Sequence, residues 1–319
     1  MRALVTGAGG FVGQWLCREL LQAGWTVWGT TLDGEVPPGA LDAEARGAVR
    51  WLRCDVTCES DLRGALDAAQ PDTIAHLAAI SFAPAAAADP FDTLQVNVLA
   101  AAKLLGLASE RLAAGTLDPR VLVVGSGEQY GRHDAKEQPL REGAEQNPAS
   151  VYGASKALQE ELALKEQKAT GLRVIAVRPF NHSGAWQSDR FLIPALVHRA
   201  LSLKGTPDAE MAVGNMSAVR DFLHVTDVCR AYLAVLDRGV PGEVYNVASG
   251  KGVSVSAVAE RVLALTGTRA RFRIDPALVR PVEVPELVGD PSKLRSATGW
   301  SPERSFDDIL HDVIRAATR

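Results

Sequence analysis

Two residues four positions apart, Tyr152 and Lys156, could together move a proton. They open a segment of helical period, and this spacing places both side chains on one face of a helix. An ammonium group about 5 Å from a phenol, at an effective dielectric constant near 20, would favour the phenolate by roughly 3 kcal/mol. That is about two pKa units below the usual value near 10. We therefore expect a phenol that exchanges a proton with a carbonyl oxygen close to neutral pH.

A serine and a glutamate precede this pair, just after the apolar run "RVLVV". Ser126 follows the run, where its hydroxyl could bind a substrate oxygen; the alternative is a turn serine between two glycines. Glu128 would point into the same cleft, either as a second acid–base group or as a carboxylate at its rim. The predicted catalytic residues are Ser126, Glu128, Tyr152 and Lys156.

The segment "TGAGGFVG" near the start of the chain could bind a dinucleotide. Its glycines at positions 7, 10 and 13 follow a predicted strand and open a predicted helix, where free backbone N–H groups favour a pyrophosphate. The residues expected to contact the cofactor are Gly7, Gly10, Phe11, Val12, Gly13, Thr31, Asp55, Val56, Leu77, Ala78, Ala79, Tyr152 and Lys156.

The end of the second predicted strand bears on which dinucleotide binds. An acid there would bond the adenosine ribose and repel a 2'-phosphate, but this chain has Thr30 and Thr31, and Asp33 comes two residues late. We therefore expect NADP(H) in preference to NAD(H), which stays open. Asp55 either accepts a hydrogen bond from the adenine amine or serves as a turn or capping acid.

The elements that must position these residues alternate between strands and helices up to residue 180. Continuously apolar strands separated by helices predict an α/β fold, a Rossmann-type doubly wound parallel sheet covered on both faces. We expect a dinucleotide-binding domain at residues 1–180, with its sheet completed from about 219–249. Residues 181–319 would form a smaller, mixed and interleaved substrate lobe.

Composition excludes several classes of protein. The chain of 319 residues is 47% hydrophobic, which is ample for a core, and a net charge of −4 with scattered basic residues argues against nucleic acid. The N-terminal residues do not resemble an export signal, and polar and proline residues interrupt the alanine-rich stretch from His76 to Pro90, so we expect a cytoplasmic protein outside the membrane. The four cysteines include no Cys-x-x-Cys pair, and we expect no metal site.

Four motifs, "TGAGGFVG", "HLAA", "GSGEQYG" and "YGASK", follow one another in this order. With them the chain resembles the extended short-chain dehydrogenase/reductase family, from Met1 to about Arg315. The resemblance implies an NAD(P)-dependent oxidoreductase that acts on a nucleotide sugar. Members often form dimers through a four-helix bundle, and predicted helices at residues 92–114 and 152–169 would suit a homodimer, although core packing would also explain them.

The segment "RPFNHSG" looks like the stretch of GDP-sugar dehydratases and reductases in which the asparagine contacts the substrate. By that resemblance Asn181 would hold the sugar diphosphate, and His182 would shape the pocket or, alternatively, act as a general base. Arginines would grip the nucleotide or its diphosphate, although each could also be a surface ion-pair member. The implied substrate-binding residues are Ser126, Glu128, Asn181, Arg190, Arg220 and Arg280.

Two subgroups of this family compete. The residues from Ser126 to Glu128 lie where GDP-mannose 4,6-dehydratases carry Thr-Ser-Glu, which favours the dehydratase. Against it, the glycine turn lacks the dehydratase's usual Gln-Asp, and the loop after the second strand is short. We therefore favour a GDP-4-keto-6-deoxy-D-mannose reductase that forms GDP-D-rhamnose. A UDP-sugar epimerase and a nonenzymatic nucleotide-binding protein of the same fold are further alternatives.

Overall fold

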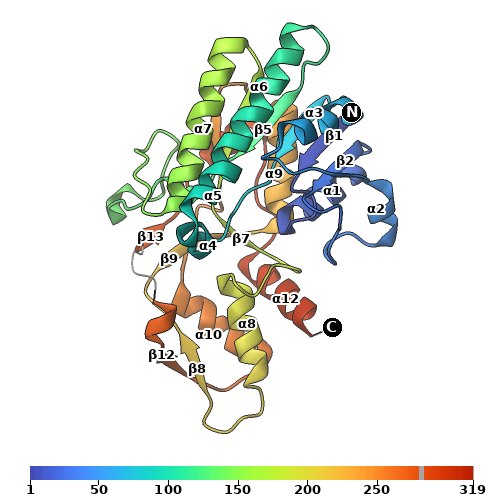
Figure 1. The fold of residues 1–319 in the computed structure, drawn as a ribbon. Coiled ribbons are helices and arrows are strands. Elements are labelled where there is room, and N and C mark those ends of the chain that lie inside the picture. Colours follow the sequence, from blue (N-terminus) through green and yellow to red (C-terminus); the bar gives the residue numbers. More distant parts are fainter. Residues whose placement is uncertain (280–283, 319) are drawn as a thin grey trace.

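The computed structural model describes residues 1–279 and 284–318, and its largest element is a sheet of seven parallel strands in the order β10–β6–β5–β4–β1–β2–β3 (Figure 1). The strands are β1 (Arg2–Thr6), β2 (Thr26–Thr31), β3 (Arg50–Arg53), β4 (Thr73–His76), β5 (Arg120–Val124), β6 (Arg173–Pro179) and β10 (Val244–Val247). The inner strands are almost wholly apolar because both of their faces are covered. The predicted doubly wound α/β fold is confirmed.

Helices cover both faces of the sheet, as Figure 1 shows. The helices packed on one face are α1 (Phe11–Gln22) and α9 (Val225–Arg238), with α11 (Ser292–Thr298) beside α9. Those on the other face are α3 (Glu59–Ala69), α6 (Ala100–Ala113) and α7 (Val151–Thr170). The short helix α2 (Ala43–Ala48) follows β2. Helix α7 begins where the Ser150 side chain accepts a hydrogen bond from the third helical N–H, and it ends at Gly171, whose φ is 79°.

The approach to α6 is one long helical run. After α4 (Ala83–Ala88), the helix α5 (Pro90–Leu94) continues through a π-helical turn, Gln95–Leu99, into α6. The run Pro90–Ala113 is long and apolar enough to cross a membrane by length and composition, but half of its most apolar window is buried inside the fold. A core helix passes the same test, so this run is weak evidence for a membrane span.

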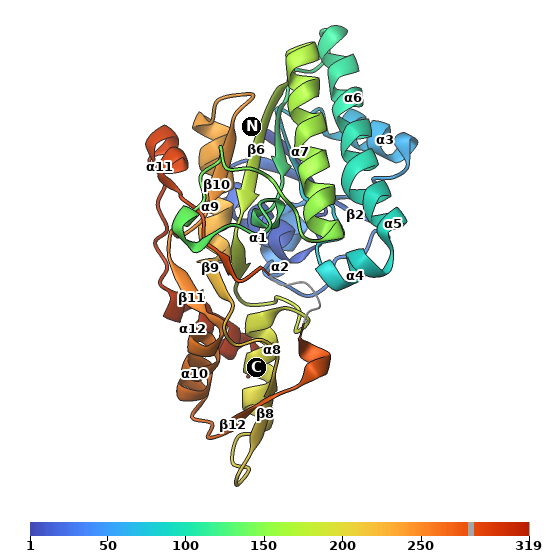
Figure 2. The same cartoon turned by 90° about the vertical axis from the view of Figure 1, so that its left-hand side faces the viewer.

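A second, smaller lobe lies beyond the carboxyl edge of the sheet, with α8, α10, β8 and β12 at its far end (Figure 2). Its strands are β7 (Asn181–Ser183), β8 (Glu210–Val213), β9 (Val219–His224), β11 (Gly252–Ser254), β12 (Arg271–Ile274) and β13 (Glu286–Leu287). Its helices are α8 (Leu192–Ser202), α10 (Val255–Thr266) and α12 (Phe306–Ala317), which share a separate apolar core. Within the segment 219–249, β10 joins the central sheet, whereas β9 lies in the second lobe between β11 and β13. The two lobes therefore interleave along the chain.

Candidate active site

The glycine-rich turn between β1 and α1 has a backbone path that side chains would block. Gly7 has a φ of 68°, and a Cβ on it would lie 2.8 Å from the backbone nitrogen of Ala78. A Cβ on Gly13 would lie 2.3 Å from the carbonyl oxygen of Gly7. Gly10 is the N-cap of α1, so the free N–H groups of this helix face the crevice at the switch point between β1 and β4.

A cavity of about 310 Å³ continues from this turn along the ends of β2 and β3. The predicted cofactor residues that line it are Gly7, Thr31, Asp55, Val56, Ala78 and Ala79. Leu77 lies beside it and donates its N–H to the carbonyl of Thr6, while Phe11 and Val12 form the first turn of α1. The structure thus brings the predicted residues of the N-terminal half to one cavity and the turn that adjoins it.

The chemistry of the cavity wall fits a dinucleotide. The Oγ1 of Thr31 is buried and has no hydrogen-bond partner in the described part of the chain. Asp55 accepts hydrogen bonds from the backbone and hydroxyl of Thr57 (2.9 and 2.7 Å), which lower the pKa of its carboxyl, so this acid does hold a turn. Asp33 bonds the N–H of Glu35 in its own loop. The end of β2 therefore carries no carboxylate that faces a ribose, and the Thr31 hydroxyl is buried beside the cavity without a partner in the described residues.

The predicted catalytic residues meet where β5 ends and α7 begins. Ser126 is the N-cap of the 3₁₀ turn Gly127–Gln129, and interaction with its hydroxyl lowers the pKa of Tyr152. Glu128 accepts a hydrogen bond from the Ser150 hydroxyl at 3.1 Å. Ser150 in turn caps α7, so the glutamate is tied to the first turn of the helix that carries Tyr152.

Lys156 lies one turn further along α7 and is buried. Its Nζ donates hydrogen bonds to the carbonyl of Val124 and to Oε1 of Gln159, both at 2.9 Å. Burial lowers the pKa of Lys156 to about 7. Burial, followed by the charge of Lys156, lowers the pKa of the neighbouring His76 to about 3. Lys156 therefore lies beside the carboxyl ends of β5, which carries Val124, and of β4, which ends at His76.

The expected acidity of Tyr152 is wrong for this structure. Burial raises the pKa of the phenol above its usual value, the charge of Glu128 raises it further, and the hydrogen bond with Ser126 lowers it only in part. The physical reason is that Lys156 shares the buried environment, directs hydrogen bonds to other acceptors and loses its own charge more easily. Tyr152 is therefore a protonated acid at neutral pH.

The segment "RPFNHSG" forms the end of β6 and the short strand β7. Asn181 opens β7 and is exposed at the carboxyl edge of the sheet. The ring of His182 is stacked on that of Phe11, with centroids 6.3 Å apart and planes 7° apart, and its Nδ1 bonds the carbonyl of Phe180 at 2.9 Å. Burial lowers the pKa of His182. This histidine thus packs against the helix that follows the glycine turn.

The arginines expected on the substrate side lie on different elements. Arg190 is exposed after β7, with its guanidinium 5.2 Å from the ring centroid of Phe82. Arg220 lies on β9 and donates a hydrogen bond to the carbonyl of Val219 at 2.8 Å. Arg280 lies outside the described residues.

The comparisons with known proteins agree with this geometry. A model of the GDP-mannose 4,6-dehydratase family matches residues 4–313. The chain belongs to this family. Membership confirms the resemblance to extended short-chain dehydrogenases/reductases.

This family member is similar to several nucleotide-sugar enzymes. It is 33% identical over 314 residues to the GDP-6-deoxy-D-mannose reductase of Pseudomonas aeruginosa, across 98% of this chain and 96% of that protein. The solved structure of RMD from P. aeruginosa with NADPH has a TM-score of 0.81 at 30% identity and covers 100% of both chains. The UDP-glucose 4-epimerase of Thermus thermophilus with NAD has a TM-score of 0.85 at 25% identity, over 99% and 98% of the chains. The chain is thus an NAD(P)-dependent oxidoreductase of the nucleotide-sugar class.

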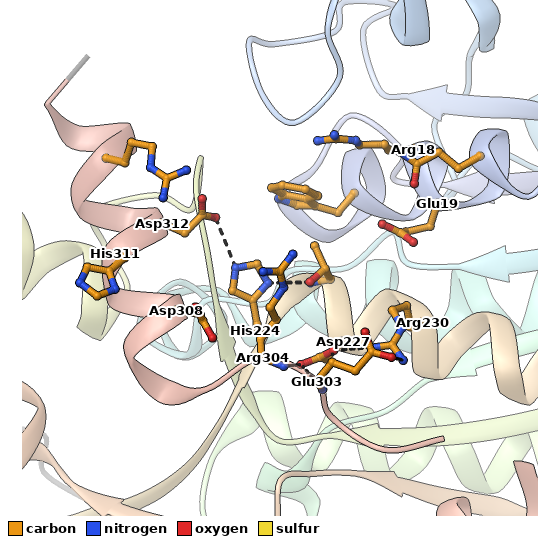
Figure 3. Close-up of a pocket in the computed structure, with 14 residues that line it drawn as sticks. Arg18, Glu19, His224, Asp227, Arg230, Glu303, Arg304, Asp308, His311 and Asp312 are labelled. Atoms are coloured by element: carbon orange, nitrogen blue, oxygen red, sulfur yellow. Dashed lines mark hydrogen bonds and ion pairs between the residues drawn. The ribbon is translucent and has the colours of Figure 1, made fainter. Parts of the chain in front are cut away.

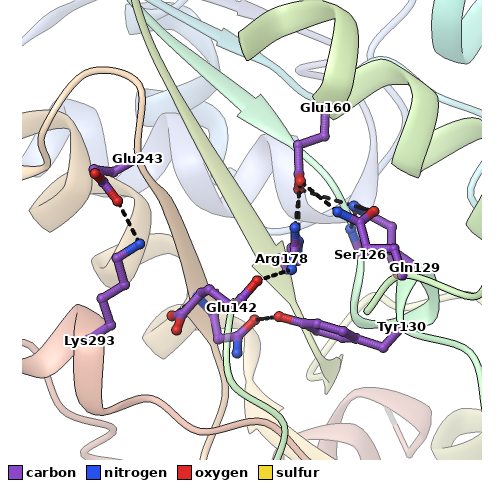
Figure 4. A network of polar contacts seen from close by, with 10 residues as sticks. Ser126, Gln129, Tyr130, Glu142, Glu160, Arg178, Glu243 and Lys293 are labelled. Atoms are coloured by element: carbon purple, nitrogen blue, oxygen red, sulfur yellow. Dashed lines mark hydrogen bonds and ion pairs between the residues drawn. The ribbon is translucent and has the colours of Figure 1, made fainter. Parts of the chain in front are cut away.

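Several buried polar residues that support the site of this oxidoreductase are absent from the prediction. Gln129, Glu160 and Arg178 form a buried network behind Ser126 (Figure 4). Asn97, in the π-helical turn, donates to the Ser155 hydroxyl at 3.0 Å and ties α5–α6 to α7. The available signal is a polar residue in an otherwise apolar run, as in "LQVNVLAA", but such a pattern does not name the partner.

A second cavity, of about 460 Å³, lies between α1, the start of α9 and α12 (Figure 3). None of the predicted site residues lines it. Its wall carries four arginines and five carboxylates, and Arg230 pairs with Asp227 at 2.7 Å. This balance of charge gives the cavity no clear preference for an anion or a cation.

Proposed function

We propose that this enzyme reduces the 4-keto group of GDP-4-keto-6-deoxy-D-mannose and forms GDP-D-rhamnose. The observation that carries the proposal is the meeting of Ser126, after β5, with Tyr152, in the first turn of α7, where burial keeps the phenol protonated. A reductase needs an acid that gives up its proton only when negative charge develops on the substrate oxygen. The alignment with a GDP-6-deoxy-D-mannose reductase over 98% of the chain supports this substrate.

The residues of the chain would divide the chemistry as follows. Bound NADPH supplies the hydride that converts the carbonyl carbon to an alcohol carbon. Tyr152 donates the proton that neutralises the resulting alkoxide, and Ser126 donates a hydrogen bond to the same oxygen. Lys156, whose third ammonium proton is not used by Val124 and Gln159, bonds the cofactor ribose. The electron pair and the proton together account for the two hydrogens gained by the ketone.

We infer a preference for NADPH from the end of β2. Thr31 lines the cavity at a strand end that carries no carboxylate, so a 2'-phosphate would meet no fixed negative charge there. The adenine amine would then donate a hydrogen bond to the second oxygen of Asp55, since the first oxygen accepts hydrogen bonds from Thr57.

The substrate side of the proposal rests on the second lobe. Asn181 at the start of β7, Arg190 and Arg220 would bind the sugar diphosphate, because amide and guanidinium donors suit phosphate oxygens. Arg280, outside the described residues, is assigned to the same group by resemblance.

We also propose that a second copy covers the face formed by α5, the π-helical turn and α7. Four large apolar side chains are exposed there: Phe91, Leu94, Leu99 and Leu158, at 78%, 42%, 52% and 41%. A homodimer through this face would bury them in a four-helix bundle. Light scattering of the protein in solution tests this.

One experiment separates the reductase from its main rival. GDP-mannose and its 4-keto-6-deoxy derivative are offered separately, each with NADPH or NADH, and coenzyme oxidation and products are followed. Oxidation of NADPH with the keto sugar alone is the expected result. Conversion of GDP-mannose without net coenzyme change would overturn the proposal in favour of the dehydratase.

The dehydratase is the second candidate because of one observation. Glu128 lies two residues after Ser126, is tied to the first turn of α7 and acts on the pKa of Tyr152. A carboxylate in this place could remove a proton next to a keto group. For a reductase, Glu128 is needed only to shape the pocket, so the Glu128→Gln variant should keep most of its keto-sugar reduction.

A further inference from the structure

Gln129 is buried behind Ser126, and both ends of its side-chain amide are bonded (Figure 4). Its Oε1 accepts a hydrogen bond from the backbone N–H of Ser126 at 2.6 Å. Its Nε2 donates to Oε2 of Glu160 at 3.0 Å and to Oε1 of Gln146 at 3.1 Å. The amide fits because position 125 is a glycine, where a Cβ would lie 2.2 Å from Oε1 of Gln129.

A buried ion pair decides which way this amide points. Arg178 binds both oxygens of Glu160, through Nε at 2.9 Å and Nη2 at 2.6 Å, and both side chains are almost fully buried. An ionised carboxylate can only accept hydrogen bonds. The Nε2 of Gln129 must therefore face Glu160, which leaves Oε1 to face Ser126. A reversed amide would set two N–H donors against each other.

The same network joins the two segments that carry the proposed catalytic residues, α7 and the turn after β5. Glu160 lies on α7, four and eight residues after Lys156 and Tyr152, so all three share one face of the helix. Ser126 lies on the separate segment after β5, and its hydroxyl also accepts the N–H of Glu128 at 3.1 Å. Gln129 holds the backbone N–H of Ser126, and the N–H of Glu128 occupies one acceptor position of the Ser126 hydroxyl. The direction of this hydroxyl is therefore restricted.

We propose that Gln129 is a positioning residue for Ser126, and that the Glu160–Arg178 ion pair sets its amide direction. The inference rests on the proposed function, because it explains how Ser126 is aligned with Tyr152 for proton donation. Among the described residues, Gln129 makes no hydrogen bond to Tyr152 and does not line the 310 Å³ cavity.

The Gln129→Met variant tests the proposal, with Gln146→Met as its matched control. Methionine fills a similar volume but leaves the Ser126 N–H without its acceptor. We expect kcat for the keto sugar to fall about tenfold to a hundredfold while KM stays within about threefold, because a small misplacement of a catalytic group acts on turnover. Gln146 shares the network without touching Ser126, so its variant should stay within about threefold in both constants. Equal losses in the two variants would mean a merely structural role and would overturn the proposal.

A second variant, Gln129→Glu, should change the pH dependence of kcat, and it tests the proposal even if Gln129→Met does not fold. Gln129→Glu places a carboxyl against Glu160, and two neighbouring carboxyls retain one proton more readily than a single one. The protonated form restores a donor toward Glu160 and an acceptor toward Ser126. The ratio of variant to wild-type kcat should therefore rise as pH falls from 8 to 6. A ratio independent of pH would contradict the inference.

Hydrogen exchange of the Ser126 amide, followed by NMR in ¹⁵N-serine-labelled protein, separates this inference from the proposed function. The amide should exchange at least about tenfold faster in Gln129→Met and at the wild-type rate in Gln146→Met. If the wild type reduces no GDP-keto sugar, the proposed function fails. The serine amide then decides alone whether Gln129 holds Ser126, and an unchanged exchange rate in Gln129→Met overturns the inference.

Discussion

The two sides of the crevice are built in different ways. The proposed cofactor side is made mainly of backbone: the glycine turn, the helix N-terminus behind it and the strand ends that line one cavity. The proposed sugar-nucleotide side is made of side chains from separate segments, such as Asn181 on β7, Arg190 after it and Arg220 on β9. One side depends on close approach of backbone to backbone, and the other on the reach of flexible charged groups.

This difference sets how each side should respond to substitution. Backbone shape cannot adjust to an added Cβ at 2.3 Å without moving a carbonyl, so changes there should be nearly all-or-none. A guanidinium is one donor group among several, so its loss should cause a graded loss of affinity. The proposed catalytic residues lie between the two sides, and their substitution should affect turnover while leaving both binding steps in place.

The largest effect is expected for Tyr152→Phe. In the proposed mechanism the phenol is the proton donor, so its loss should lower kcat by about 10²- to 10³-fold with keto sugar and NADPH. Binding of NADPH, measured by calorimetry, should change less than about threefold because both sides of the crevice are intact. Near-normal turnover in Tyr152→Phe would show that Tyr152 is not the proton donor.

Gly13→Ala should come next and act on the cofactor side alone. Its new Cβ would meet the Gly7 carbonyl at 2.3 Å, so we expect at least about a hundredfold weaker NADPH binding by calorimetry. Gly106→Ala in α6 is the control, because its Cβ would meet nothing within 4 Å. The control should bind normally and gain about 0.5–1 kcal/mol in stability. Normal NADPH binding by Gly13→Ala would contradict the nearly all-or-none response that we expect on the side of the crevice built from backbone.

The same difference explains how far the sequence could predict the molecule. Strands such as "RVLVV" and the glycine spacing are local patterns, so the sheet, its helices and the position of the turn follow from them. The second lobe is less predictable because its pairing is nonlocal: β9 lies between β11 and β13, which come about 30 and 65 residues later.

The acidity of Tyr152 shows a different limit. Spacing places Tyr152 and Lys156 on one helical face, but burial depends on elements that the spacing does not contain. In the structure burial raises the pKa of the tyrosine and lowers that of the lysine, against the direction that charge alone predicts. The network around Gln129 could not be predicted for the same reason, since Glu160 comes from α7 and its ion-pair partner Arg178 comes from β6.

The buried Lys156 gives a prediction in pH. Its pKa is about 7 in the folded protein, whereas an unfolded lysine titrates near 10.4. Between these values the unfolded chain binds the extra proton, so wild-type stability should rise from pH 7 to pH 9.5, by an amount of the order of a few kcal/mol. This contribution is absent in Lys156→Met. The free energy of unfolding measured with urea should therefore differ less between pH 7 and pH 9.5 in the variant than in the wild type. The same pH dependence of stability in both proteins would show that folding does not lower the pKa of Lys156.

The smallest effect is expected for Arg220→Met on the sugar-nucleotide side. Methionine keeps the aliphatic part of the side chain on β9 and removes the guanidinium, so KM for the GDP-keto sugar should rise about tenfold while kcat stays within about threefold. NADPH affinity should not change. Arg261→Met is the control, because Arg261 pairs with Asp307 (2.6 Å) within the same lobe and is not assigned to substrate. A fall in kcat with unchanged KM would mean that Arg220 acts on the catalytic group, and the two sides of the crevice would then not be separable.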